Sequence, residues 1–140
     1  MKIYDGKDMI LGRLAARVAK DALLGETVRV INCEKIVVSG KKTKVVAEEK
    51  EKRARRGYPL KSAKRIRLPD RHVRRAIRGM LPWKQSRGKE AFKRIMCYIG
   101  VPQEFADKEG IVLQDASVKK LPNLKYITIS EMCRSVGGKI

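Results

Sequence analysis

Four arginines between residues 71 and 78 are spaced to share one face of a helix. Arg71, Arg74, Arg75 and Arg78 fall on one side of a helix predicted over residues 71–81. Each guanidinium keeps its positive charge and can donate two parallel hydrogen bonds to a phosphate. Exposed helix faces usually mix charges of both signs, yet no acidic residue lies among these arginines. The stripe therefore predicts a row of phosphate contacts. The face predicted to pack against the core consists of Val73, Ala76, Ile77, Met80 and Leu81.

The basic character extends on both sides of this stripe. Residues 50–94 hold 18 lysines and arginines against Glu51, Asp70 and Glu90, whereas the rest of the chain holds 16 basic and 12 acidic residues. Most of the net charge of +19 is thus confined to one segment. A concentrated excess of one sign indicates a binding surface for a polyanion, and the phosphate backbone of a nucleic acid is the natural partner.

The predicted contacts extend from a mostly solvated helix over residues 41–56, through an extended basic loop over residues 60–70, to the segment after Pro82. Long irregular basic arms suit RNA better than duplex DNA, and no base-reading motif is present, so we expect recognition of backbone and shape. The predicted RNA-binding residues are Arg53, Arg55, Arg56, Lys61, Lys64, Arg65, Arg67, Arg71, Arg74, Arg75, Arg78, Gly79, Trp83, Lys84, Arg87, Gly88, Lys89, Lys93 and Arg94. Trp83 could stack on an unpaired base or ribose, or it could be a half-buried packing residue.

Motifs of nucleotide-dependent enzymes are absent. The turn from Gly6 to Gly12 lacks the close glycine pair of a dinucleotide-binding loop, and Lys35 and Lys42 replace the glycine and the hydroxyl that a P-loop requires. His72 is the only histidine, and no nucleophile elbow or zinc-protease helix exists. We therefore expect no catalytic residue, no cofactor and no small-molecule substrate. A nucleotide-dependent enzyme and a protein that compacts nucleic acid without specificity are the alternatives.

The cysteines indicate a reducing compartment. Cys33, Cys97 and Cys133 are odd in number and widely spaced, so they predict buried thiols rather than disulfides or a metal site. No apolar run approaches the roughly 20 residues needed to span a bilayer, and the start of the chain lacks the apolar core of a signal peptide. We expect no membrane contact and a cytoplasmic location.

The elements that must position the basic segment alternate between strand and helix. A strand over residues 2–4, a helix capped by Asp8 and ended by Gly25, and a strand over residues 27–32 form a predicted β-α-β unit. The later elements are a helix over residues 86–95, a buried strand over 96–99, a last strand over 126–129 and a final helix capped by Ser130. This alternation predicts one α/β domain over residues 1–140, with a mainly parallel sheet, helices on both faces and a basic insertion at about residues 50–94.

Three segments resemble the L13 family of large-subunit ribosomal proteins. They are Asp5 with Leu-Gly-Arg-Leu-Ala at residues 11–15, the run over residues 30–40, and Arg-Gly-Met-Leu-Pro at residues 78–82 followed by Arg87 and Gly88. The Tyr-Ile-Gly-Val-Pro connection at residues 98–102 is similar to the archaeal branch. The resemblance implies a three-layer α/β/α fold around a four-stranded, mainly parallel sheet with basic loop and helical extensions.

The same resemblance implies a function. The chain would be a structural constituent of the large ribosomal subunit, bind its rRNA, support early assembly and touch neighbouring ribosomal proteins. Gly79 and Gly88 would then lie where the backbone approaches RNA closely or where a helix is capped, although either could equally be a packing glycine.

Overall fold

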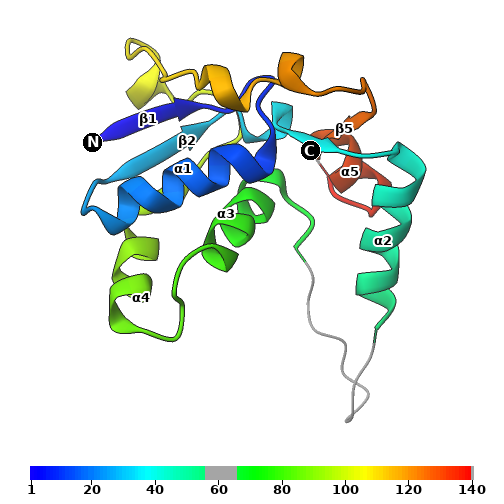
Figure 1. Ribbon diagram of the computed structural model, residues 1–140, viewed down its shortest axis with the longest axis horizontal. Helices are drawn as coiled ribbons and strands as arrows, with labels where there is room; N and C mark the ends of the chain where they lie inside the picture. The colour runs from blue at the N-terminus through cyan, green and yellow to red at the C-terminus, as the bar shows by residue number, and fades with distance from the viewer. Residues whose placement is uncertain (56–65, 140) are drawn as a thin grey trace.

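Strands and helices alternate along most of the chain, as the sequence predicts. The computed structural model describes residues 1–55 and 66–139, and Figure 1 shows their arrangement. In chain order the elements are β1 (Lys2–Asp5), α1 (Leu11–Leu23), β2 (Val28–Ile31), β3 (Val37–Ser39), α2 (Lys42–Ala54), α3 (Pro69–Gly79), α4 (Ser86–Lys93), β4 (Ile95–Cys97), β5 (Tyr126–Thr128) and α5 (Ile129–Ser135).

The main sheet is parallel and has the strand order β1-β2-β4. Lys2 of β1 lies opposite Val28 of β2, and Val28 in turn lies opposite Ile95 of β4. The unit β1-α1-β2 is the predicted β-α-β unit, in which a helix carries the chain back across the sheet so that the strands can run parallel. The predicted α/β class with a mainly parallel sheet is confirmed.

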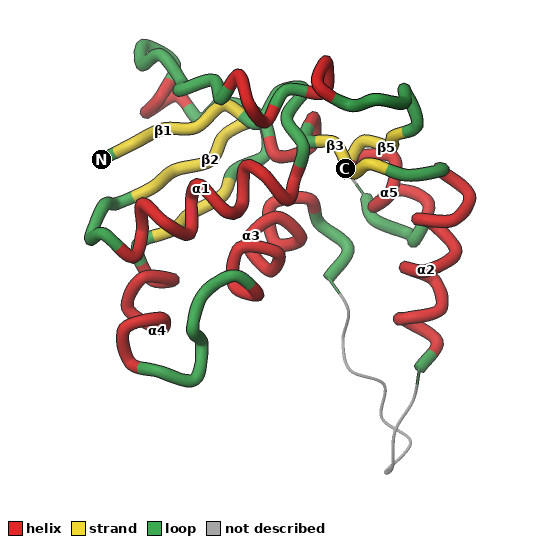
Figure 2. Tube along the Cα trace, viewed as in Figure 1, coloured by secondary structure: helices red, strands yellow, loops and turns green. Residues whose placement is uncertain are grey.

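The last strand does not join this sheet as a fourth parallel member. Instead β5 pairs antiparallel with β3, with Val37 opposite Thr128, in a separate two-stranded sheet (Figure 2). After β2 ends at Ile31, Asn32 takes a left-handed conformation (φ 53°) and the 3-10 turn Cys33–Lys35 follows, so β3 begins at Val37 after only a short connection. A parallel crossover needs about a dozen residues or more, and β3 therefore begins too soon to lie parallel beside β2.

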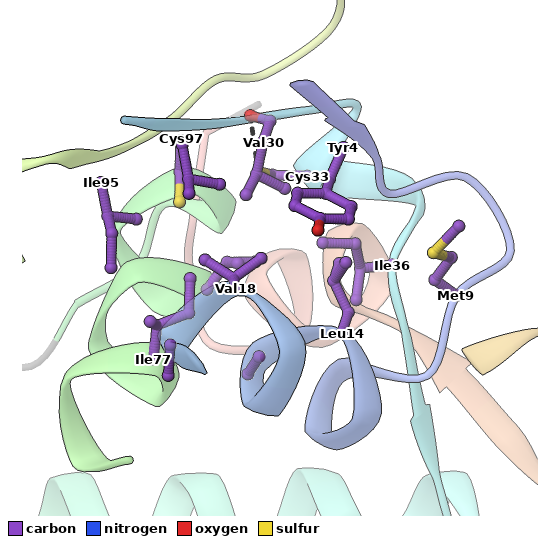
Figure 3. Packing of buried hydrophobic residues seen from close by; sticks show 14 of the residues in the cluster. Tyr4, Met9, Leu14, Val18, Val30, Cys33, Ile36, Ile77, Ile95 and Cys97 are labelled. Atoms are coloured by element: carbon purple, nitrogen blue, oxygen red, sulfur yellow. Dashed lines mark hydrogen bonds between the residues drawn. The ribbon is translucent and has the colours of Figure 1, made fainter. Parts of the chain in front are cut away.

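One face of the main sheet packs against α1, α3 and α4. Leu14 and Val18 of α1 and Ile77 of α3 are fully buried against Val30 and Ile95 of the sheet, and Figure 3 shows them meeting in one apolar layer. The apolar face of α1 is thus buried in the core. This layer anchors α3, which carries the arginine stripe on its outer side.

The opposite face of the main sheet is covered by short turns. Ile3 and Ile31 pack there against Phe105, which lies in the 3-10 turn Gln103–Phe105. The ring centroids of Tyr98 and Phe105 are 5.6 Å apart. The helix expected on this face is absent from the described residues. Glycines and prolines at positions 100, 102, 110 and 122 interrupt the segment that would have to form it.

Two helix caps differ from the predictions. Asp8 adopts a left-handed φ of 55°, and α1 begins at Leu11 without a side-chain cap. The carbonyl of Asp8 accepts a hydrogen bond from the Val118 N–H, and this strand-like contact delays the start of the helix. The cap of α5 is Thr128 rather than Ser130, because the Thr128 hydroxyl accepts the N–H of Glu131 at 3.2 Å.

The cysteines are buried and free, as predicted. The neighbouring Cys97 thiol and burial raise the pKa of Cys33, and burial raises the pKa of Cys133 to about 11. None of the described helices is long and apolar enough to cross a membrane. Within the described ranges, no group of three or more histidine, cysteine and acidic side chains is arranged to hold a metal ion.

Candidate nucleic-acid interface

Helix α3 places the arginine stripe on the side that faces away from the sheet. Val73 and Ile77 point into the core, whereas Arg71, Arg75 and Arg78 are exposed and Arg74 is half-buried. Pro69 occupies the first turn, where a helix has no hydrogen-bond acceptor for a backbone N–H, so this proline starts the helix without loss. The alternation of apolar and basic residues thus fixes which side of α3 is available to a partner.

The arginines form one wall of a groove with a volume of about 870 Å³. Its other side comes from the turn after α3 and from α4. The lining residues are Ile66, Arg71, Arg74, Arg75, Arg78, Gly79, Leu81, Trp83 and Phe92. Six of them are predicted RNA-binding residues, namely the four arginines of α3, Gly79 and Trp83, and the groove brings them together.

Aromatic rings hold two of these arginines in place. The Cζ atom of Arg78 lies 4.2 Å from the centroid of the Trp83 ring, and the Cζ atom of Arg74 lies 4.4 Å from that of Phe92. Trp83 and Phe92 meet edge to face, with centroids 5.1 Å apart and planes at 87°. The π faces attract the guanidinium charges. The sequence left the role of Trp83 open, and in the structure its ring packs against both Arg78 and Phe92.

The groove is rich in positive charge that acidic side chains do not neutralise. Within residues 1–55 and 66–139, no carboxylate lies within 4.0 Å of the basic groups of Arg71, Arg74, Arg75 or Arg78. The Nε atom of Arg74 is buried and has no hydrogen-bond partner among the described atoms. Its terminal Nη groups are consequently the ones left to meet a ligand. Close like charges repel one another, and an anion in the groove would relieve this repulsion.

The basic residues of α2 are partly paired within the chain. The Arg55 guanidinium lies 2.8 Å from the Glu51 carboxylate and holds the pKa of that carboxyl below its usual value. Arg53 donates a hydrogen bond to the carbonyl of Ile66 and so ties α2 to the segment that enters α3. The predicted contacts Arg56, Lys61, Lys64 and Arg65 lie outside the described residues.

The predicted cations after α3 fall into an exposed group and one half-buried residue. Arg94 is half-buried, and its Nη1 donates to the carbonyl of Ala22 near the end of α1 at 3.3 Å. Arg29 donates to the Arg94 carbonyl at 3.3 Å. These contacts give Arg94 a role in joining α1, β2 and α4. The exposed residues after α3 are Lys84, Arg87, Lys89 and Lys93, and Arg67, which precedes α3, is exposed as well.

The two glycines predicted to approach RNA differ in their surroundings. A Cβ on Gly88 would overlap the carbonyl of Pro82, so the close contact between α4 and the preceding turn requires glycine there. At Gly79, by contrast, no described atom outside its own helix backbone and chain neighbours lies within 4 Å of the Cβ position. Packing within the described part of the chain thus explains Gly88 and leaves Gly79 unexplained.

Sequence reasoning missed three apolar residues of the groove, Ile66, Leu81 and Phe92. Phe92 lies in the helix predicted over residues 86–95, and its aromatic type there was the one signal available. Leu81 was assigned to the core face of the helix. In the structure it is buried and also lines the floor of the groove. Met80 was assigned to the same face but is 44% exposed, because it follows the last residue of α3.

These features define a small, basic α/β protein with an arginine-lined groove that acidic side chains of the described residues do not neutralise. A family model described as "Ribosomal protein L13" matches residues 1–104. The chain therefore belongs to the ribosomal protein L13 family. It is a structural ribosomal protein rather than an enzyme, as the resemblance implied, and the family locates it in the cytoplasm with the ribosome.

Similar proteins from archaea cover almost the whole chain, and each carries the name "Large ribosomal subunit protein uL13". The protein of Methanopyrus kandleri is 43% identical over 137 residues, which cover 96% of this chain and 86% of that protein. That of Methanosarcina barkeri is 41% identical over 140 residues, covering 99% of each. That of Haloarcula marismortui is 40% identical over 142 residues, covering 97% of this chain and 90% of that protein. The archaeal resemblance predicted from residues 98–102 agrees with these relatives.

Proposed function

We propose that this chain is a structural constituent of the large ribosomal subunit and binds large-subunit rRNA through the groove on α3. Its relatives carry a large-subunit name over nearly their full length. The proposal also includes the predicted support of early subunit assembly and contacts with neighbouring ribosomal proteins. Residues 1–140 would act as one domain, with the basic segment at about residues 50–94 as its RNA-binding part.

One observation carries the proposal. The guanidinium groups of Arg71, Arg74, Arg75 and Arg78 share one side of α3 and have no acidic partner among the described residues. Guanidinium groups bind phosphate oxygens through paired hydrogen bonds, and removal of a charge-assisted hydrogen bond has a large effect on affinity. The exposed cations after α3 would add phosphate contacts without reading bases.

The proposal is tested by reversing the charge of the groove in the full chain. A triple variant, Arg74→Glu, Arg75→Glu and Arg78→Glu, should bind a large-subunit rRNA fragment about a hundredfold more weakly or worse, since each charge-assisted contact contributes about 1.5–3 kcal/mol. The control, Lys119→Glu, Lys125→Glu and Lys139→Glu, changes the net charge equally at residues outside the groove and should bind nearly as well as the wild type. Urea unfolding would check that both variants fold.

Three results would contradict this function. Unchanged affinity of the triple variant would show that the groove does not bind rRNA. Equal affinity of the wild type for duplex DNA and for folded rRNA would favour the alternative of a compacting protein. Saturable binding of a mononucleotide at low micromolar concentration would favour the alternative of a nucleotide-dependent protein.

A further inference from the structure

The groove on α3 has two chemically different parts. Its rim carries the arginines, whereas Ile66, Leu81, Trp83 and Phe92 supply apolar surface beneath them. A phosphate group needs only the cationic rim. The apolar floor indicates that the ligand also presents an apolar face.

Unpaired nucleotides have such a face, and paired ones do not. In an A-form duplex the bases are stacked inside, so a protein meets mainly phosphates and ribose hydroxyls, whereas the bases of loops, bulges and single strands stack on aromatic rings or guanidinium planes. The groove volume of about 870 Å³ lies within the range of sites that hold small molecules and suits a nucleotide rather than a duplex.

Gly79 marks one edge of this site. It ends α3, lines the groove and has open space where a Cβ would lie. Glycine is less favourable than alanine within a helix, and packing in the described chain gives no reason for it. A ligand backbone that passes close to the end of α3 provides such a reason.

We propose that the groove binds an unpaired RNA segment, with base surface against Trp83 and Phe92, phosphates on Arg74 and Arg78, and the strand crossing at Gly79. Trp83 and Phe92 also act as positioning residues, because they hold the guanidinium groups at 4.2 and 4.4 Å from their ring centroids. This inference rests on the proposed function and specifies which form of RNA the site accepts.

The only tryptophan of the chain, Trp83, lines the groove and so reports its occupancy. Its fluorescence would be titrated in the full chain with single-stranded decauridylate and with an RNA duplex of the same number of phosphates. We expect the single strand to change the fluorescence at about tenfold lower concentration than the duplex, given the contribution of base stacking. A duplex that changes the fluorescence at the same or lower concentration would overturn the inference.

Two alanine variants test the approach at Gly79. Gly79→Ala should weaken binding of the single strand about tenfold, since one lost close contact is comparable to one stacked base, and should leave duplex binding unchanged. Gly12→Ala is the matched control, because Gly12 also lies in a helix, α1, with no described atom within 4 Å of its Cβ position. Both variants should fold at least as stably as the wild type, and single-strand affinity of Gly79→Ala equal to that of Gly12→Ala would overturn the inference.

The two proposals fail in different ways. Normal rRNA binding by the triple glutamate variant would contradict the proposed function itself. Loss of rRNA binding by that variant, together with normal single-strand binding by Gly79→Ala, would leave the function intact and reject only the assignment of an unpaired strand to this groove.

Discussion

The guanidinium group of Arg78 lies over the ring of Trp83, with its Cζ atom 4.2 Å from the ring centroid. The two residues come from the last turn of α3 and from the turn that follows it. The short connection through Leu81 and Pro82 brings the ring back under the helix end. The ring thus restricts the Arg78 side chain before a ligand binds. Less side-chain conformational entropy is therefore lost on binding.

Replacing Trp83 by leucine should separate orientation from charge. Trp83→Leu keeps every cation but removes the ring that holds Arg78, so we expect a fivefold to tenfold loss of rRNA affinity, on the order of 1 kcal/mol. The slope of log affinity against log salt should stay the same. Arg78→Gln should instead reduce that slope by about 0.7–0.9, since one phosphate contact is lost. A reduced slope in Trp83→Leu would instead show that Arg78 loses its phosphate contact when the ring is removed.

Arg94 should behave differently from the arginines of the groove. Its guanidinium donates to the Ala22 carbonyl, and its own carbonyl accepts from Arg29. Arg94→Gln is therefore expected to lower the free energy of unfolding by about 0.5–1.5 kcal/mol, the usual contribution of a hydrogen bond, while the salt dependence of rRNA binding stays unchanged. Urea unfolding and binding at several salt concentrations would measure both. A normal stability with a reduced salt slope would assign Arg94 to the RNA instead.

Gly88→Ala should destabilise the fold. The added methyl would overlap the Pro82 carbonyl, and a rigid backbone group cannot move aside as the end of a side chain can. We expect a loss of about 1–3 kcal/mol from overpacking, measured by urea unfolding. Gly12→Ala, which has open space, provides the comparison and should be neutral or stabilising. Equal stability of the two variants would contradict the close approach of α4 to Pro82.

The buried carboxylate of Asp21 should make stability depend on pH. Burial favours the neutral form of Asp21, but the Tyr4 hydroxyl, Lys2 and Arg17 outweigh it and lower the pKa of the carboxyl. Lys2 Nζ lies 3.3 Å and Arg17 Nε 3.8 Å from the carboxylate, and the Tyr4 hydroxyl donates a hydrogen bond to it. A lowered pKa in the folded state means that this stabilisation is complete above the unfolded pKa of about 4 and is lost as the pH falls through the folded value.

Asp21→Asn is therefore expected to lose about 1–3 kcal/mol at pH 7, a loss limited by Lys2 and Arg17, which are partly exposed and can return to water. At pH 3 the difference between variant and wild type should narrow, because protonation removes the charge from the wild type as well. Asp115→Asn, at an exposed ion pair with Lys120, is the control and should change stability little at either pH. A difference that is the same at pH 7 and pH 3 would rule out the ionised carboxylate as its source.

The sequence predicted the local elements of this fold well because their signals are local. The spacing of Leu14 and Val18 is enough to define the buried face of α1, and Gly25 ends the region with the left-handed φ of 99° that glycine allows. The pairing of β5 was not predictable in the same way. A β-branched strand looks alike in a parallel or an antiparallel sheet, and its partner depends on where the short turn at Asn32 to Lys35 places β3.

The candidate site likewise combines features that the sequence predicts with features that depend on how the elements pack. The side of α3 that bears its arginines follows from helical periodicity, since Val73 and Ile77 must be buried. The contact of Arg74 with Phe92 joins two helices, and the use of Arg94 at the end of α1 joins residues 72 positions apart. Such contacts depend on how elements pack, which composition and spacing do not encode. Charge counting alone therefore treats Arg78 and Arg94 as equivalent, whereas the structure gives them different partners.

Pairing of β3 with β5 also sets an order of events during translation. Helix α2 has no buried residue, contacts β5 and α5, and is joined to α5 by the ion pair between Lys42 and Glu131, 3.2 Å apart. Ser39 ends β3 and Tyr126 begins β5, so at about 5–20 residues per second the nascent chain exposes α2 for roughly ten seconds before its support has been synthesised. The helix that precedes the most basic part of the chain thus gains its contacts with β5 and α5 only when the last elements of the chain have been made.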